Sequence, residues 1–340
     1  MTVLRRLAQD APAPVFVARG GGAGLLPVEL QADPRLRMVG SARHATVLLA
    51  AGRFAGAMGD ALDRVHDQLP STGAVVWWTA DPDAARPPSL AEATVFGGPD
   101  PVEAVLAAHR RAVSQPGARR AVLADEPPHP FEGRGDHGQG GEGMMGGVPF
   151  GRAMAMTADD RDGLALDQLP LQLGPFLLGL PNGVRVSAVL QGGVVQEAEL
   201  EGLDLGEGRA LAGADATGAR ADLRWLAEAL RLGGLDALAR RAARLARAGA
   251  TDAAACARVA KLVRRSGLPA AWSKVGVVEG EDARSRLERR LRFDPRAGGR
   301  RPLPADRIGR ALAGQDWSDA LVTIWSFASV GERAPAAAAP

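Results

Sequence analysis

Short apolar runs alternate with helix-like patterns along the first third of the chain. Three short apolar runs predict strands: 14–18, 46–50 and 74–78. The run 46–50 is uninterrupted, which is typical of a strand buried on both faces. Apolar residues at helical spacing over 58–69 predict a helix that ends before Pro70. Strands that alternate with helices indicate a parallel sheet. We therefore predict an α/β fold for residues 1–125, with an open parallel sheet flanked by helices.

Two further elements complete this predicted half. Pro101 suits the first turn of a helix, and Val102, Val105 and Leu106 follow it on one face. The short apolar stretch 121–124 predicts one more strand.

A glycine-rich stretch separates this half from the rest of the chain. Residues 126–163 lack apolar periodicity and predict a long loop or linker. The segment 133–147 within it favours a loop that lies against a partner and contacts it through Met144 and Met145. The alternative is a metal site with two histidines and carboxylates. Its ligands would come from His129, Glu132, Asp136, His137 and Glu142.

The pattern changes to alternation after residue 163. Residues 184–190 alternate between apolar and polar positions, and 194–200 returns as the partner strand. Gly192 and Gly193 permit the tight primed turn that joins two such strands. We predict a β-hairpin here.

Helical spacing dominates the last third. Thr251 or Asp252 caps one of these helices. An arginine-rich helix over 284–291 either faces anionic lipid or an acidic subunit, or is an ordinary solvated face. The prediction for 164–332 is an α+β domain with a helical C-terminal part, and for 333–340 a disordered tail.

Composition narrows the class of protein. The 340 residues are 46% apolar and 24% charged, as in ordinary globular proteins. The formal net charge is only +2, which is too small an excess to indicate nucleic-acid binding. A single cysteine, Cys256, excludes an internal disulfide framework and favours a reducing compartment. No apolar run reaches the roughly 18 residues of a membrane-spanning helix, so we expect a cytoplasmic protein.

Five segments of the predicted α/β half also contain sequence motifs. They are 20–24, 41–52, 58–70, 75–76 and 97–106. In this order and at these separations they resemble the small, cluster-carrying subunit shared by respiratory complex I and the membrane-bound nickel–iron hydrogenases. The stretches 171–200 and 261–292 resemble the large subunit that docks against it. The resemblance implies a fusion of shrunken versions of the two subunits.

The ligands of the two metal centres of that family are missing from this chain. The positions that resemble cluster ligands are Gly22, Leu25, a residue near 79–81, and Gly98, and none of these supplies a thiolate. A [4Fe–4S] cluster needs about four thiolates. Nickel-binding Cys-x-x-Cys pairs are absent, and Phe176-Leu177 replaces the histidine of a Gly-Pro-x-His-Pro motif. We therefore expect no cofactor and no bound metal, with Cys256 as a core residue.

Two adjacent tryptophans, Trp77 and Trp78, end a predicted strand. We expect one in the core and the other at a domain interface. In the alternative they line a pocket together with the methionine-rich loop.

Together these expectations describe a non-catalytic, accessory subunit of a membrane-associated assembly similar to complex I or to energy-converting hydrogenases. It would lie on the inner face of the cytoplasmic membrane, bound to integral-membrane subunits, without a membrane span of its own and without nucleic acid. The alternative is a quinone-oxidoreductase subunit that keeps a quinone-like pocket between its halves. A third reading is a stand-alone binding module whose glycine-rich loop holds a metal.

Overall fold

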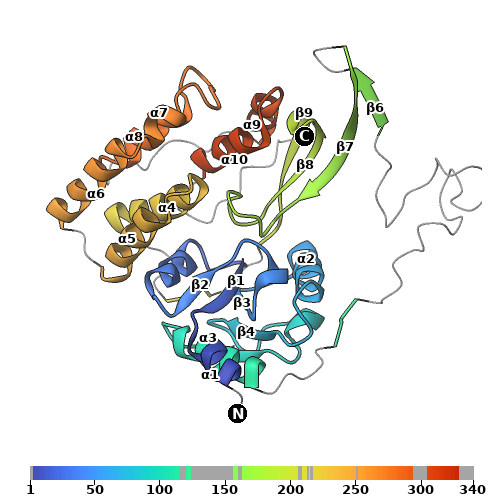
Figure 1. Ribbon diagram of the computed structural model, residues 1–340, viewed down its shortest axis with the longest axis vertical. Coiled ribbons are helices and arrows are strands. Elements are labelled where there is room, and N and C mark those ends of the chain that lie inside the picture. Colours follow the sequence, from blue (N-terminus) through green and yellow to red (C-terminus); the bar gives the residue numbers. More distant parts are fainter. Residues whose placement is uncertain are drawn as a thin grey trace, which may run out of the picture.

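The chain folds into two halves that lie against each other (Figure 1). The computed structural model describes residues 3–114, 120–123, 156–159, 163–205, 209–212, 214, 217–249, 252–293 and 305–328. One half contains a parallel sheet, and the other contains an antiparallel sheet and a group of helices. This confirms the predicted mixed α/β class.

Five parallel strands form the sheet of the N-terminal half. They are β1 (Ala13–Arg19), β2 (Leu36–Met38), β3 (Val47–Ala51), β4 (Ala74–Trp78) and β5 (Thr94–Phe96). Their order across the sheet is β2-β1-β3-β4-β5, and every pairing is parallel. All five residues of β3 are buried, as its unbroken apolar run predicts. The predicted open parallel sheet is confirmed.

Helices cover both faces of this sheet. α2 (Gly56–Asp67) packs on one face, and α3 (Val102–Ser114) packs on the other together with the 3-10 helix η1 (Leu26–Ala32). α1 (Val3–Asp10) lies against α3. Two short 3-10 helices, η2 (Ala42–His44) and η3 (Pro88–Leu90), lie in the connections. The sheet is therefore a central layer with an apolar core on each side.

The strand predicted at 121–124 is wrong for the residues that the structure describes. Residues 121–123 belong to neither sheet. The backbone N–H groups of Val122 and Leu123 instead donate to the carboxylate of Asp67, at 3.0 and 2.9 Å. In a strand these N–H groups would donate to the carbonyl oxygens of a neighbouring strand. Here they donate to the Asp67 carboxylate at the end of α2.

A four-stranded antiparallel sheet begins the second half. Its strands are β6 (Met156–Asp159), β7 (Ala165–Leu173), β8 (Val184–Gln191) and β9 (Val194–Gly202), paired in that order. The predicted hairpin is β8–β9, and Gly192 and Gly193 both have positive φ, 57° and 86°, as a type I′ turn requires. β6 lies within the stretch that the sequence assigns to the loop 126–163.

Seven helices of the second half lie in the described part of the chain. They are α4 (Gly218–Leu232), α5 (Asp236–Arg247), α6 (Ala253–Arg265), α7 (Leu268–Ala271), α8 (Ala283–Arg290), α9 (Ala305–Leu312) and α10 (Trp317–Ser326). α9 and α10 pack on β8 and β9, whereas α4, α5, α6 and α8 share a second apolar cluster with α10. Asp252 caps α6, since its carboxylate accepts from the N–H groups of Ala254 and Ala255. Cys256 is buried in the helical cluster.

The arginine-rich helix α8 is not uniformly solvated, because Arg286 is buried while Arg284 is exposed. Arg286 of α8 is buried and donates to the carbonyl oxygens of Gly276 and Glu281 and to Ser326 Oγ. Burial lowers the pKa of its guanidinium to about 10. Arg290 pairs with Asp222 at 2.8 Å. Part of this arginine cluster thus holds helices of the same chain together.

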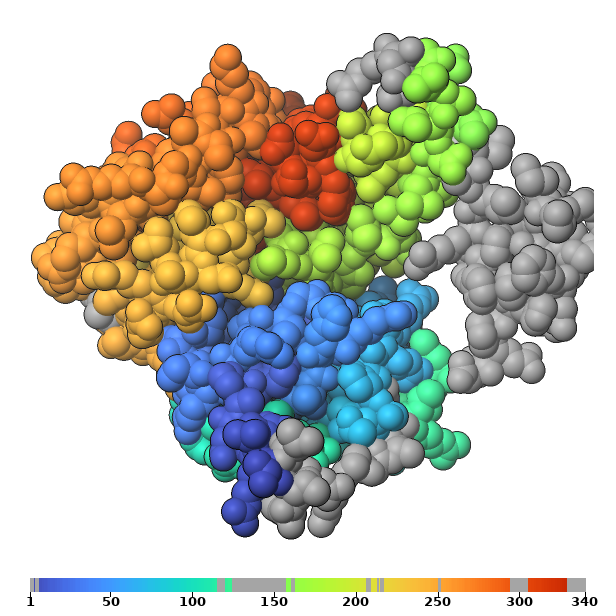
Figure 2. Space-filling view, viewed as in Figure 1, coloured from blue at the N-terminus to red at the C-terminus, as the bar shows by residue number. Residues whose placement is uncertain are grey.

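The two halves share one short element, η1. Leu26 and Leu30 lie in the core of the parallel sheet, whereas Val28 lies in the cluster of α4 to α8. Glu29, between them, lies 3.1 Å from Arg220 Nε and 2.7 Å from Arg224 Nε, both on α4. Figure 2 shows the blue parallel-sheet half directly against the yellow and green segments of the other half.

Among the described residues, none of the helices combines the length and the apolar character that crossing a bilayer requires.

Candidate functional site

The strand order of the parallel sheet singles out one location for a ligand. The chain leaves β1 toward β2 on one side, and β3 lies on the other side of β1. Ligands of open parallel sheets bind at such a reversal, outside the carboxyl ends of the strands. Here that location is bounded by Gly20 to Gly22 after β1 and by Gly52 and Arg53 after β3.

A segment of the second half occupies this location. A Cβ atom on Gly21 would lie 1.9 Å from the carbonyl oxygen of Leu205, so only glycine permits the observed approach. The N–H of Leu211 donates to the carbonyl oxygen of Gly22 at 2.8 Å. Arg53 Nη1 donates to the carbonyl oxygen of Arg209 at 2.7 Å. The chain's own backbone therefore takes the bonds that a ligand would make there.

Apolar side chains of the second half also occupy this location. Leu211 and Ala214 are 3% and 8% exposed and lie in one cluster with Ala23 and Trp78. Trp78 Nε1 donates to the carbonyl oxygen of Gly98 at 2.8 Å. We call this set (Gly22, Trp78, Leu211 and Ala214) the sheet-edge contact.

The positions that resemble cluster ligands differ in what they contact. Gly22 has a φ of +77° and faces Arg53, Arg209 and Ala210. Leu25 packs into the helical cluster of the second half, whereas Gly98 contacts Trp78 on the sheet side. Among the described residues there is also no group of three or more histidine, cysteine, aspartate or glutamate side chains placed to hold a metal ion.

The two predicted pocket tryptophans lie in different cores. Trp77 faces the α2 side of the sheet and donates to the carbonyl oxygen of Gly52 at 2.8 Å, whereas Trp78 belongs to the sheet-edge contact. His137, Glu142, Met144 and Met145 lie outside the described residues.

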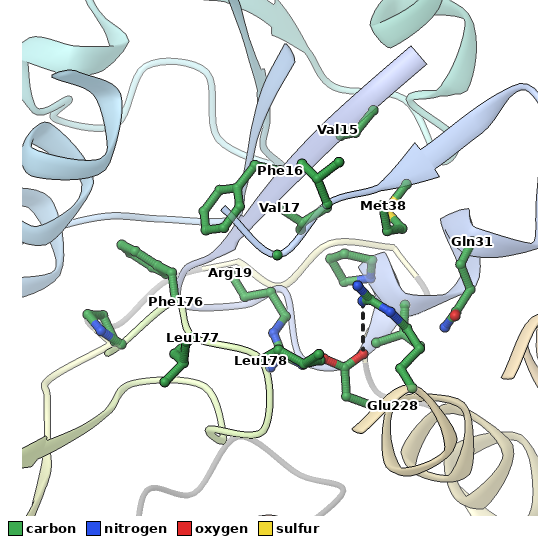
Figure 3. A pocket seen from close by; sticks show the side chains of 16 residues that line it. Val15, Phe16, Val17, Arg19, Gln31, Met38, Phe176, Leu177, Leu178 and Glu228 are labelled. Atoms are coloured by element: carbon green, nitrogen blue, oxygen red, sulfur yellow. Dashed lines mark ion pairs between the residues drawn. The ribbon is translucent and has the colours of Figure 1, made fainter. Parts of the chain in front are cut away.

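A cavity of about 60 Å³ lies between the halves, beside β1 (Figure 3). We call it the crevice. Its walls come from β1, η1, the end of β2, the segment 175–178 and α4. Apolar side chains such as Val15, Met38 and Leu177 form most of the lining, and neither tryptophan takes part. The polar lining residues are Arg19, Gln31, Glu228 and Arg231.

Arg19 enters the crevice from the last position of β1 (Figure 3). Its Nη2 donates to the carbonyl oxygen of Leu180 at 3.1 Å, while its buried Nη1 has no hydrogen-bond partner among the described residues. Burial lowers the pKa of this guanidinium, and nearby Glu228 opposes the shift. The side chain is therefore held in place with one donor unused.

The other polar groups come from η1 and α4. Gln31 is 6% exposed, and its Nε2 likewise lacks a hydrogen-bond partner in the described part of the chain. Glu228 is also 6% exposed and lies 3.7 Å from Arg231, one turn later on α4. The polar groups of the described lining are two guanidinium groups, one amide and one carboxylate, which together can bind a polar or charged ligand.

The sequence patterns missed these four residues. They lie at positions 19, 31, 228 and 231, and only folding brings them together. One signal was present, because Arg19 is a charged residue directly after the apolar run that predicts a buried strand. No feature of the sequence around Gln31 predicts that this side chain is buried.

The chain matches no protein-family model, no curated protein and no solved structure.

Proposed function

We propose that this chain is a non-catalytic, architectural subunit of a membrane-associated assembly similar to complex I or to energy-converting hydrogenases. In this proposal its two halves correspond to reduced forms of the small and large subunits and act as one docked unit without an iron–sulfur cluster. The filled sheet-edge contact is the observation that supports it most directly. A site at the carboxyl ends of β1 and β3 is where a parallel sheet binds a cofactor, and the chain's own backbone at Leu205 and at 209–211 lies there.

Partner contact has separate support from the exposed strand β7. None of its nine residues is buried. Leu166 and Leu169 are 36% and 43% exposed, and the preceding Leu164 is 64% exposed. Residues of a strand alternate between its two faces, so Leu166 and Leu169 expose apolar side chains on different faces of β7. Exposed apolar side chains on one strand favour a protein contact. We propose that integral-membrane subunits supply it, at the inner face of the cytoplasmic membrane.

The crevice gives less support to the quinone alternative. Its volume of about 60 Å³ is well below the roughly 150 Å³ of an apolar protein cavity that holds benzene. Its buried arginine, glutamine and glutamate side chains also favour a charged or strongly polar ligand over a quinone ring.

Purification from membranes tests the proposal. The full chain is isolated with a mild detergent from the cells that express it, co-purifying proteins are identified by mass spectrometry, and iron is measured. We expect integral-membrane proteins at a constant ratio and iron far below the roughly four atoms per chain of a cubane cluster. Recovery of the chain only as a free protein, or iron at cluster stoichiometry, would contradict the proposal.

A pair of matched substitutions locates the contact. Leu169→Ser on β7 should lower the yield of the membrane proteins several-fold, because it places a hydroxyl in an apolar interface. Leu262→Ser on α6 is the control, since Leu262 is similarly exposed, at 37%, on a different surface. Equal yields from both variants would remove β7 from the proposed contact.

A further inference from the structure

The crevice contains buried hydrogen-bond donors that lack acceptors. Arg19 Nη1 and Gln31 Nε2 both line it, and neither has a partner among the described residues. Buried donors are nearly always bonded to protein, water or a ligand, because an unmet donor costs about 1–3 kcal/mol. From these two groups we infer that the crevice is a binding site for a small planar monoanion of the carboxylate class.

The charges of the lining favour an anion. Arg19 and Arg231 are cationic, and Glu228 is the single carboxylate among the lining residues. Glu228 thus balances only one of the two guanidinium groups. Its distance from Arg231 Nη1, 3.7 Å, is longer than a hydrogen bond, so Arg231 keeps donors for another acceptor. One bound monoanion would neutralise the site.

The arrangement of the donors also limits the shape of the ligand. In Figure 3, the side chains of Arg19 and Gln31 belong to two different elements that line the crevice, β1 and η1. A carboxylate has two oxygens that can each accept from a separate donor, and guanidinium groups match its planar geometry. A neutral molecule with a single acceptor would leave one of the two donors unmet.

The volume of the crevice suits a small ligand. At about 10–15 Å³ for each water-sized position, a cavity of about 60 Å³ holds roughly four to six such positions. Formate and acetate, which have three and four non-hydrogen atoms, fit this range. Apolar walls that include Val15, Met38 and Leu177 suit a methyl group and lower the local dielectric, which strengthens the charged contacts.

Other unpaired donors of the molecule do not form a comparable site. Arg224 Nη2, Trp225 Nε1 and Trp325 Nε1 are also buried without a partner among the described residues. None of these three residues lines the crevice. The crevice combines unmet donors, an unbalanced cation and space for a ligand.

Titration of the purified full chain tests the inference. Sodium acetate or formate replaces sodium chloride at constant ionic strength and pH, and the thermal midpoint is followed together with calorimetric heats. We expect a saturable rise with acetate and formate, and no such rise with the tetrahedral dianion sulfate. A rise that never saturates, or an equal rise with sulfate, would overturn the inference.

Three variants assign the effect to the crevice. Gln31→Leu and Arg19→Gln each remove one donor, and each should weaken acetate binding about tenfold, the value of one charge-assisted hydrogen bond. Arg240→Gln makes the same change of charge at an exposed position of α5 and should bind acetate as the unmodified chain does. If Arg19→Gln does not fold, the test rests on Gln31→Leu. An unchanged affinity of Gln31→Leu for acetate refutes the site. These binding measurements depend neither on iron content nor on membrane partners. The inferred anion site can therefore be refuted while the proposed function stands, and the reverse also holds.

Discussion

The two halves of the chain meet in two places close to the end of β1, and these places differ in what fills them. At the sheet-edge contact, beside Gly22, backbone from the second half bonds to the first half and Leu211 fills the space beside Trp78. In the crevice, beside Arg19, polar groups from both halves surround a cavity and two donors have no acceptor among the described residues.

This difference separates a structural role from a binding role within one interface. A location filled by the chain's own backbone needs no ligand to be stable, whereas unmet buried donors lower stability until an acceptor arrives. We therefore expect substitutions at the sheet-edge contact to change folding, and substitutions in the crevice to change the response to an anion.

The largest effect should come from the ion pair beside the sheet-edge contact. Arg224, 1% exposed, donates to Glu29 and to the carbonyl oxygen of Ala214. Glu29→Gln leaves this guanidinium buried without its counter-charge, which costs about 3–5 kcal/mol of the free energy of unfolding. Urea denaturation measures the loss.

An exposed ion pair in the same half provides the control for this substitution. Glu103 is 73% exposed and pairs with Arg35 at 2.7 Å. Glu103→Gln should cost less than about 1 kcal/mol. If the two glutamine variants lose similar stability, the buried pair does not hold the halves together.

A smaller loss should follow from emptying the sheet-edge contact. Leu211→Ala removes buried methyl groups and should cost about 2–4 kcal/mol in urea denaturation, because the surrounding sheet cannot collapse fully. Leu7→Ala, at a position 62% exposed, should stay within about 0.5 kcal/mol. The Leu211→Ala protein should keep its saturable response to acetate, and loss of that response would mean that the two places are not independent.

The sequence was informative where a local pattern determines the structure. Short apolar runs predicted β1, β3 and β4, and the uninterrupted run of β3 is typical of a strand buried on both faces. β2 and β5 have only three residues each, too few to show a period. The run at 121–124 looked similar, but the Asp67 carboxylate accepts its described N–H groups.

Contacts between distant segments could not be predicted in this way. The sequence places Gly22 in a turn that resembles a cluster-ligand position, and the structure adds a steric reason for Gly21 and Gly22 in the approach of Leu205 and Ala210. The arginines of α8 suggested a surface, yet Arg286 is buried because Gly276, Glu281 and Ser326 accept its donors.

The smallest effect concerns two buried glutamines. It distinguishes a buried amide that is hydrogen-bonded within the chain from one that is not. Gln191 is 4% exposed, and its Nε2 donates to the carbonyl oxygens of Ala158 and Asp159 at 3.0 and 3.2 Å. Gln31 is 6% exposed and its Nε2 donates to no described residue. Replacing a bonded glutamine by leucine leaves its former partners unmet, whereas replacing an unbonded one removes an existing penalty.

Denaturation in chloride buffer without carboxylate compares the two glutamine substitutions. Gln191→Leu should lose about 1–3 kcal/mol, and Gln31→Leu should lose nothing or gain up to about 1 kcal/mol. In saturating acetate the advantage of Gln31→Leu should disappear, because the unmodified protein alone then gains the bond between Gln31 and the anion. If Gln31→Leu is destabilised in both buffers as strongly as Gln191→Leu, then Gln31 is bonded within the folded chain itself and the crevice offers no donor to an anion there.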